Sequence, residues 1–543
     1  MRQRDTGGVV TTKRHVSGNK IVLVLWSILI AAAVFWIAPK SGYFEWSEAP
    51  RNALNGAFFV DLLHERPFGD PVGWAESYYL QYPALTVLFY PPLFHVILAL
   101  TFSVFGVSHA VAVGTVVGFL LFLLWGVYAI GKHYLDQWAG IFSMLLVSCA
   151  PAVLVWSQQV MLEVPMLAFT TWSVYFLAVY VDRRKTSDLA LAAGAALCAV
   201  YTKQTAVIVL LPMALYVMAI TRGSPFRRRS DLMILAIAAL LLIPLLIIQW
   251  KFGGFNVSTV VDRSDVDIDR FGLEGLFWYG IRLHQIVGIP SILAIVGGGL
   301  VTLWCGRWPA ARRGVVAMTL WFFAGYALLT TIDLKETRHA VLLAPAAAIL
   351  GGLLLSGAVR DGRVRRLLFL CGVLVFPVAL WAARAPWVSG YAEMAELVGT
   401  RVPDGSRVLF LGNRDGSFIF NVRSRIPDKD LVVVRADKLF LNIKIMPEQG
   451  LNPRDLSQSE IRALLQRLGI RYIVSVPEIW TDAEVIRNFY AVLAGDDFEH
   501  IDAVPVGGSA EESQLLLFRF NGEVKEPPDR LQYQTSVGVM VAE

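Results

Sequence analysis

Charged residues that lie beside the apolar segments are the first candidates for chemistry in this chain. They comprise three carboxylates and two cations: Glu45, Glu48, Glu163, Lys203 and Arg338. Charges next to a membrane are costly, and those retained there commonly serve function. A carboxylate can take the proton of a hydroxyl group, while lysine and arginine stabilise charge that develops on a phosphate leaving group. The pattern therefore predicts transfer of a group from a phosphate carrier to a hydroxyl.

Three further side chains are predicted to bind the substrate: Tyr90, His95 and His339. Neither histidine has a carboxylate or cysteine partner at metal-ligand spacing, so no metal site is predicted. Each charged candidate also has a non-catalytic interpretation. Glu163 could only stabilise the start of its helix, Lys203 could extend from the membrane to water, and Arg338 could anchor its segment at the interface.

The elements that must position these residues are membrane helices. The 543 residues are 56% hydrophobic and only 17% charged, whereas soluble domains carry about 25% charged residues. Apolar runs of about 18 or more residues recur between Ile21 and Ala383, each long enough to cross a bilayer. The sequence predicts a basic N-terminus over 1–20, a transmembrane domain over 21–385 and a soluble α/β domain over 386–543. In the last domain, strands are predicted over 408–411, 431–434 and 471–476, with a helix that starts at Ser459. The run 189–220, interrupted by polar residues around Lys203, is predicted to form a tight helical hairpin.

Eleven runs are predicted to cross the membrane: 21–38, 109–130, 138–156, 162–181, 189–202, 204–220, 231–250, 286–305, 315–332, 340–357 and 367–385. Another apolar run, 86–105, is predicted to be an interfacial or re-entrant helix in a first outer loop spanning 39–108. With that placement the cytoplasmic segments hold twice as many Lys and Arg residues as the outer ones. The prediction is a multi-pass protein of the cell (inner) membrane with an extracytoplasmic C-terminal domain.

Charge and cysteine content exclude two other classes. The net charge is +5, but the basic residues form short clusters between apolar runs, without the aromatic platforms that bind nucleic acid. No nucleic-acid partner is predicted. All four cysteines lie within apolar runs, so neither a disulfide framework nor a cysteine zinc site is indicated.

The order of several short motifs resembles a known family. They are Glu45-Trp-Ser-Glu48, Arg51-Asn52-Ala-Leu54-Asn-Gly56, Tyr90-Pro-Pro-Leu-Phe-His95, Phe105-Gly106-Val-Ser108, Met161-Leu-Glu-Val-Pro165, Tyr201-Thr-Lys203 and Arg338-His339 leading to Pro345. Over residues 40–350 this series resembles the GT-C membrane glycosyltransferases of family 39. That family includes protein O-mannosyltransferases and lipid A aminoarabinose transferases.

The resemblance implies a GT-C fold and a reaction. The expected enzyme is an inverting, metal-independent glycosyltransferase at the outer face. Its donor is a polyprenyl-phosphate sugar and its acceptor a glycan, lipid or protein. No cofactor is expected beyond this lipid-linked substrate, although the residues leave the use of a divalent ion open.

The resemblance also implies roles for individual residues. The family's first loop carries an Asp-Glu pair with the catalytic base, and this chain has Ser47-Glu48 at that place. We expect Glu45 or Glu48 to be the base, with Glu45 slightly favoured because its aromatic neighbours can desolvate it. Glu163 resembles the second acidic residue. Tyr90 replaces a lysine found in many members, which leaves Lys203 and Arg338 to contact the phosphate.

Two alternatives stay open from the sequence. One is a different GT-C enzyme, such as a polymerase of surface polysaccharide. The other is a transporter or flippase, whose substrate pathway would also need charged residues. Transporters usually show internal repeats and broken helices near the bilayer midplane. This chain shows no repeat and places its charges at the ends of its spans, which favours the glycosyltransferase.

Overall fold

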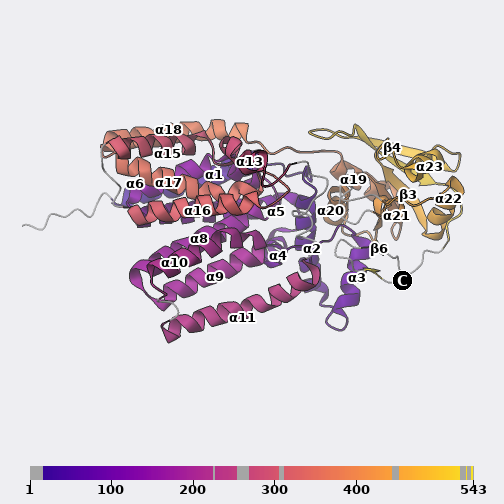
Figure 1. The fold of residues 1–543 in the computed structure, drawn as a ribbon. Helices are drawn as coiled ribbons and strands as arrows, with labels where there is room; N and C mark the ends of the chain where they lie inside the picture. Colours follow the sequence, from indigo (N-terminus) through magenta and orange to yellow (C-terminus); the bar gives the residue numbers. More distant parts are fainter. Residues whose placement is uncertain are drawn as a thin grey trace, which may run out of the picture.

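The computed structural model describes residues 16–223, 227–253, 268–304, 311–442, 452–525, 533–534 and 540–541. Most of the predicted basic N-terminus and Cys305 lie outside these ranges. Figure 1 shows a bundle of long helices with a domain of strands and shorter helices at one end. This arrangement confirms the prediction of a multi-span helical membrane protein with a C-terminal α/β domain.

The bundle contains a helix at each of the eleven predicted spans. They are α1 (Val16–Ile37), α5 (His109–Tyr134), α6 (Gln137–Ser148) with α7 (Pro151–Ser157), α8 (Glu163–Arg183), α9 (Thr186–Thr202), η1 (Gln204–Ala206) with α10 (Val207–Ile220), α11 (Arg229–Phe252), α15 (Ile289–Trp304), α16 (Arg312–Thr330), η3 (His339–Leu343) with α17 (Ala344–Ala358), and α18 (Gly362–Ala382). Of the described helices, six are long and apolar enough to cross a membrane alone, or seven if α6 and α7, bent by 65°, form one span.

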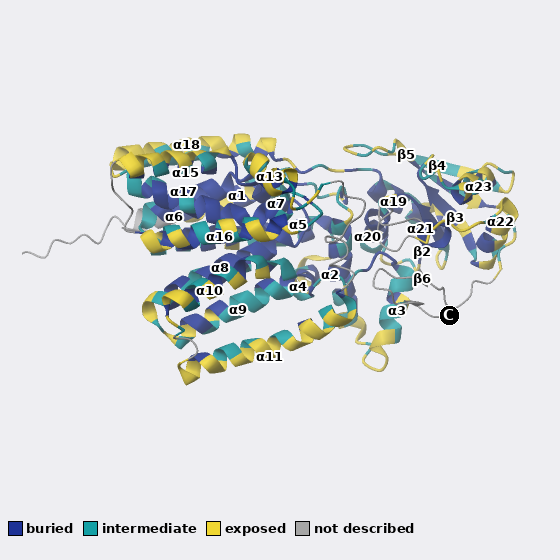
Figure 2. Ribbon diagram, viewed as in Figure 1, coloured by how far each residue is buried: buried dark blue, intermediate teal, exposed yellow. Residues whose placement is uncertain are grey.

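Burial separates the inner from the outer helices of the bundle. α6 and α17 pack together and are almost wholly buried, whereas α11 and α18 expose apolar side chains along most of their length (Figure 2). A helix that is apolar on every side suits a lipid environment. The predicted hairpin over 189–220 is present, because the chain leaves helical geometry at Lys203, between α9 and η1.

The first loop forms three short helices between the bundle and the C-terminal domain: α2 (Glu48–Glu65), α3 (Pro71–Gln81) and α4 (Leu93–Phe105). The run predicted as an interfacial helix over 86–105 is helical only after Pro92. Its 13 residues extend about 20 Å, short of the roughly 30 Å hydrocarbon core. Helix α4 packs against α2. A later loop contains α13 (Leu273–Ile281) and α14 (Leu283–Ile286).

The C-terminal domain is built around a five-stranded sheet in the order β2-β1-β3-β5-β4. Its elements are α19 (Tyr391–Arg401), β1 (Arg407–Leu411), α20 (Asp415–Arg425), β2 (Val432–Arg435), α21 (Ala436–Phe440), α22 (Gln458–Arg467), β3 (Ile470–Ser475), α23 (Glu484–Leu493), β4 (Phe498–Pro505) and β5 (Gln514–Phe520), with a separate pair β6 (Tyr533–Gln534) and β7 (Met540–Val541). The first three strands are parallel, and β5 runs antiparallel to β3.

The three predicted strands are present, but other details of this domain differ from the sequence-based expectation. Helix α22 is capped by Ser457, two residues before the predicted start, because Ser457 and Glu460 form a capping box. Strands β4 and β5 were not predicted. Strands β1, β2 and β3 are almost continuously buried, whereas β4 has only intermediate and exposed residues and therefore lacks the signal of a buried strand.

One hydrophobic core extends from the bundle into the C-terminal domain. Phe44, just before α2, stacks on His109 of α5 with ring centroids 3.8 Å apart and meets Phe420 of α20 edge to face at 5.3 Å. Val388 and Phe418 belong to the same cluster of buried residues. The C-terminal domain therefore packs directly on the first loop.

Candidate active site

Glu48 is the first residue of α2 and lies at the centre of a charged cluster. Its Oε1 is 2.8 Å from Nη1 of Arg338, and its Oε2 accepts a hydrogen bond of 3.1 Å from the hydroxyl of Tyr90. Arg338 also forms an ion pair with Glu336 through Nε. Segments separated by 290 positions in the sequence thus meet at one carboxylate.

A second ion pair lies on the other side of Tyr90. Nζ of Lys203 is 2.6 Å from Oε1 of Glu163, and these side chains are only 7% and 2% exposed. The same Nζ lies 5.5 Å from the ring centroid of Tyr90. Oε2 of Glu163 and Nε2 of His339 are buried and have no hydrogen-bond partner within the described ranges. Both atoms are free to bind a polar ligand.

The electrostatics of the cluster hold Glu48 ionised. Burial by itself would raise its pKa, but the charges of Arg338 and Lys203 and the hydrogen bonds from Arg338 and Tyr90 outweigh burial and lower the pKa to about 2. Burial, followed by the charge of Glu48, raises the pKa of Tyr90 well above its usual value. The tyrosine hydroxyl therefore stays protonated and donates to the carboxylate.

Asparagine side chains of α2 fix this helix against its neighbours. Asn52 donates to the carbonyl of Val160 at 3.0 Å, and Oδ1 of Asn55 accepts from the backbone N–H of Thr86 at 2.9 Å. His95 is wholly buried, with Nε2 3.2 Å from Oδ1 of Asn52 and 3.4 Å from Nδ2 of Asn55. His95 therefore joins α4 to α2 at Asn52, which lies one helical turn along α2 from Glu48.

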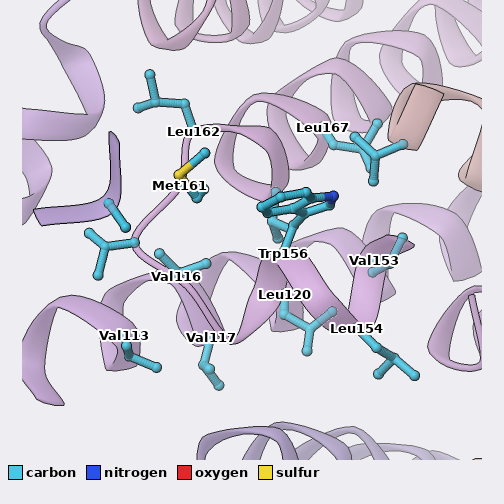
Figure 3. Packing of buried hydrophobic residues seen from close by; sticks show 14 of the residues in the cluster. Val113, Val116, Val117, Leu120, Val153, Leu154, Trp156, Met161, Leu162 and Leu167 are labelled. Atoms are coloured by element: carbon cyan, nitrogen blue, oxygen red, sulfur yellow. The ribbon is translucent and has the colours of Figure 1, made fainter. Parts of the chain in front are cut away.

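Apolar packing holds the segment that leads to Glu163. Figure 3 shows Trp156 of α7 surrounded by aliphatic side chains of α5 and α8, among them Leu120 and Leu167. Met161 and Leu162, the last residues before α8, belong to the same cluster and are almost wholly buried. This close packing fixes the start of α8 and thereby the position of Glu163.

Glu45 lies apart from this cluster. Its Oε2 is 3.3 Å from Nη2 of Arg414 and accepts a hydrogen bond of 2.7 Å from Ser509, both in the C-terminal domain. Arg414 is in turn 2.6 Å from Glu512. The three-residue separation of Glu45 and Glu48 accounts for the difference, because Glu48 begins a helix whereas Glu45 precedes it. The structure thus places Glu48, and not Glu45, in the charged cluster.

An apolar groove of about 630 Å³ lies among helices α1, α4, α5 and α8. Its lining includes Phe35, Ile97, Thr101, Gly118 and Phe169. Two of these residues lie close in sequence to the cluster, because Ile97 follows Tyr90 by seven residues and Phe169 follows Glu163 by six.

The fold matches those of several membrane enzymes of known structure. ArnT from Cupriavidus metallidurans, solved bound to undecaprenyl phosphate, aligns with a TM-score of 0.62 and 14% identity over 93% of this chain and 98% of ArnT. The mycobacterial arabinofuranosyltransferase AftD aligns with a TM-score of 0.52 and 14% identity over 93% of this chain and 40% of AftD. The oligosaccharyltransferase AglB from Archaeoglobus fulgidus was solved with an inhibitory peptide and a dolichol-phosphate. It aligns with a TM-score of 0.50 and 11% identity over 87% of this chain and 71% of AglB.

Fold and sequence together indicate what the chain is similar to: it has the fold of GT-C membrane glycosyltransferases. Residues 90–248 match the model of the family described as dolichyl-phosphate-mannose-protein mannosyltransferase. No curated protein sequence matches the chain. The resemblance to GT-C family 39 is confirmed by these matches, in fold over most of the chain and in sequence over residues 90–248.

Two contributions to the site were missed by the sequence analysis. Glu336 had no assigned role, yet it is the second partner of Arg338. Contacts of the first loop with the C-terminal domain were also missed, because residues more than 350 positions away form them. A carboxylate two residues before an arginine is a signal that could have identified Glu336.

Proposed function

We propose that the chain transfers a sugar from a polyprenyl-phosphate-linked donor to an acceptor hydroxyl at the outer face of the membrane. The observation that carries this proposal is the pair of carboxylate–cation contacts on either side of Tyr90, Glu48–Arg338 and Glu163–Lys203. A base and two phosphate-binding cations are the groups that this reaction needs.

Each residue has a step in the proposed reaction. The acceptor oxygen attacks the anomeric carbon of the sugar while the bond from that carbon to the phosphate oxygen breaks, and polyprenyl phosphate leaves with the bonding electrons. Glu48 takes the acceptor proton. Lys203 and Arg338 stabilise the charge on the departing phosphate, and Glu163 orients the acceptor. A single displacement of this kind inverts the anomeric centre.

Donor binding also changes the basicity of Glu48. A carboxylate whose pKa is about 2 is a weak base, and Arg338 is a principal cause of that low value. When the donor phosphate shares Arg338, it takes part of this charge away from Glu48. The pKa of Glu48 then rises toward the range in which a carboxylate accepts protons effectively.

The apolar groove supports a lipid-linked donor. Its lining can cover part of a polyprenyl chain. Ile97 of this lining follows Tyr90 by seven residues, and the Tyr90 ring lies 5.5 Å from Nζ of Lys203. The ligands of two proteins with this fold agree with the idea, since ArnT was solved with undecaprenyl phosphate and AglB with a dolichol-phosphate. Tyr90 and His339 complete the proposed binding site. His95 supports the site by holding α4 against α2.

The proposal is tested by comparing surface glycans, glycoproteins and lipids by mass spectrometry with and without the gene. We expect one species to lose a single sugar in the deletion strain and to regain it when the wild-type gene is restored. The control is the Glu48→Gln gene expressed at the same level, which should not restore the sugar. Identical glycan, glycoprotein and lipid profiles in both strains would contradict the proposed function.

We further propose that the cluster and the C-terminal domain, residues 386–543, lie outside the cytoplasm and that residues 21–385 form the catalytic membrane domain. The placement of basic residues supports this orientation. The short helix α4 also supports it, since an interfacial segment at that place keeps the later basic clusters on the cytoplasmic side.

Cysteine labelling on intact cells tests this orientation. Asp482 and Arg227 are exposed positions in the C-terminal domain and in the loop before α11. A membrane-impermeant maleimide should label Asp482→Cys without cell disruption, and Arg227→Cys only after disruption. The unsubstituted chain measures labelling of the native cysteines. The opposite labelling pattern would reverse the proposed topology.

A further inference from the structure

Helix α20 of the C-terminal domain lies along α2, the helix that begins with Glu48. Near the start of both helices, Nη2 of Arg51 is 2.7 Å from Oδ1 of Asp415. Near their ends, Nε of Arg423 is 2.9 Å from Oδ2 of Asp61. The two contacts lie about 15 Å apart along α2 and about 12 Å along α20, so the helices run in the same direction.

The charges on the two helices are reciprocal. Helix α2 carries a cation first and an anion later, whereas α20 carries an anion first and a cation later. A reversal of α20 would bring Arg51 toward Arg423 and Asp61 toward Asp415, which places like charges together, and an axial shift would separate both ion pairs. The two ion pairs therefore fix both the direction and the axial position of α2 relative to α20.

Arg51 and Asp61 are not placed to stabilise α2 itself, unlike Glu48 in its first turn and His64 in its last. An arginine in the first turn and an aspartate near the last turn both oppose the helix dipole. In α20, by contrast, Asp415 at the start and Arg423 near the end agree with the dipole. The arrangement on α2 is therefore explained by the contact with α20.

The segment before α2 is held by the same helix. Asn421 donates to the carbonyl of Gly42 at 3.1 Å, and Arg425 donates to that of Ser41 at 2.7 Å. Gly42 has φ of +79°, and a Cβ at this position would lie 2.1 Å from Oδ1 of Asn421. Only glycine allows this close approach.

Helix α20 is in turn anchored to the sheet. Arg435, at the end of β2, is 2.9 Å from Oδ2 of Asp415 and 2.6 Å from Oδ2 of Asp437. All three side chains are buried. Ion pairs therefore connect the sheet to α20 and α20 to α2, the helix that begins with Glu48.

We infer that α20 positions Glu48 for catalysis, with Asp415 and Arg423 as positioning residues in the C-terminal domain. This inference rests on the proposed function, since it assumes that Glu48 is the base. The C-terminal domain would then be required for turnover without touching donor or acceptor through these residues. A displacement of a catalytic group by about 1 Å can lower the rate by about 100-fold.

The test exchanges the charges of the pair distant from the site. Arg423→Asp places two carboxylates together and should lower turnover about 10- to 100-fold, while binding of undecaprenyl phosphate to the purified protein stays unchanged. The exchanged variant Asp61→Arg/Arg423→Asp should recover most of the activity, because the ion pair is restored with opposite polarity. Turnover is measured in membrane vesicles as formation of the sugar-bearing species that the deletion strain lacks.

Two controls make each result decisive. Arg519→Asp breaks an ion pair with Glu499 between β5 and β4, remote from α2, and should leave turnover unchanged. If Arg423→Asp does not accumulate, Arg423→Gln removes the same ion pair without repulsion and should still lower turnover selectively. Full activity of the Arg423 variants beside an inactive Glu48→Gln overturns the inference alone. An active Glu48→Gln overturns the base assignment and this inference together.

Discussion

Replacing Glu48 by glutamine is expected to lower turnover by about 10²- to 10⁴-fold, the range that general-base catalysis supplies. Glutamine keeps the size of the side chain and can still accept from Tyr90, but it cannot take the acceptor proton. Removal of the negative charge also frees Arg338 from its carboxylate partner. Undecaprenyl phosphate should therefore bind the variant at least as tightly as it binds the wild-type protein.

Glu45→Gln is the matched control, because it makes the same chemical change three residues earlier in the chain. Glu45 contacts Arg414 and Ser509 rather than the charged cluster, so we expect a much smaller loss of turnover. Glu163→Gln should fall between the two if Glu163 orients the acceptor. A dead Glu163→Gln beside a fully active Glu48→Gln would show that the base is Glu163. Activity in all three variants would contradict the proposed mechanism.

Loss of either cation should weaken donor use by about 10- to 100-fold, because a charge-assisted hydrogen bond to phosphate contributes roughly 1.5–3 kcal/mol. We expect Lys203→Met and Arg338→Met to raise the concentration of undecaprenyl phosphate needed for half-maximal binding by this factor. Arg338→Met should also raise the pKa of Glu48, since the charge and hydrogen bond of Arg338 lower it.

Stability must be separated from donor binding in these variants. Lys203 and Glu163 form a buried pair, and removal of one partner of such a pair can cost about 3–5 kcal/mol. The double variant Lys203→Met/Glu163→Gln leaves no buried charge and should unfold closer to the wild-type temperature, yet it should still bind undecaprenyl phosphate weakly. Lys251→Met, an exposed cation at the end of α11, is the control. If Lys203→Met and Arg338→Met both bound undecaprenyl phosphate with wild-type affinity, neither cation would belong to the donor site.

Local sequence properties were sufficient for the membrane architecture. Each predicted span is a run of apolar residues, and hydrophobicity alone requires such a run to be helical in a membrane. The break at Lys203 and the helix start after Pro92 were also readable locally. The apolar run 189–220 is too long for one span and has a polar interruption at Lys203, and a proline pair interrupts a helix. The parallel strands β1, β2 and β3 were found as short apolar runs between turns.

The choice between Glu45 and Glu48 depended on tertiary structure. The aromatic neighbours of Glu45 favoured that residue, but the fold brings Glu48 to Arg338, in the loop between α16 and η3, while Arg414 and Ser509 bind Glu45. His95 matched a family motif, but the fold buries it between Asn52 and Asn55. Sequence identifies residue types that can do chemistry, whereas the partners that set their charge and position come from segments hundreds of residues away. Those partners are selected by packing, which no local pattern records.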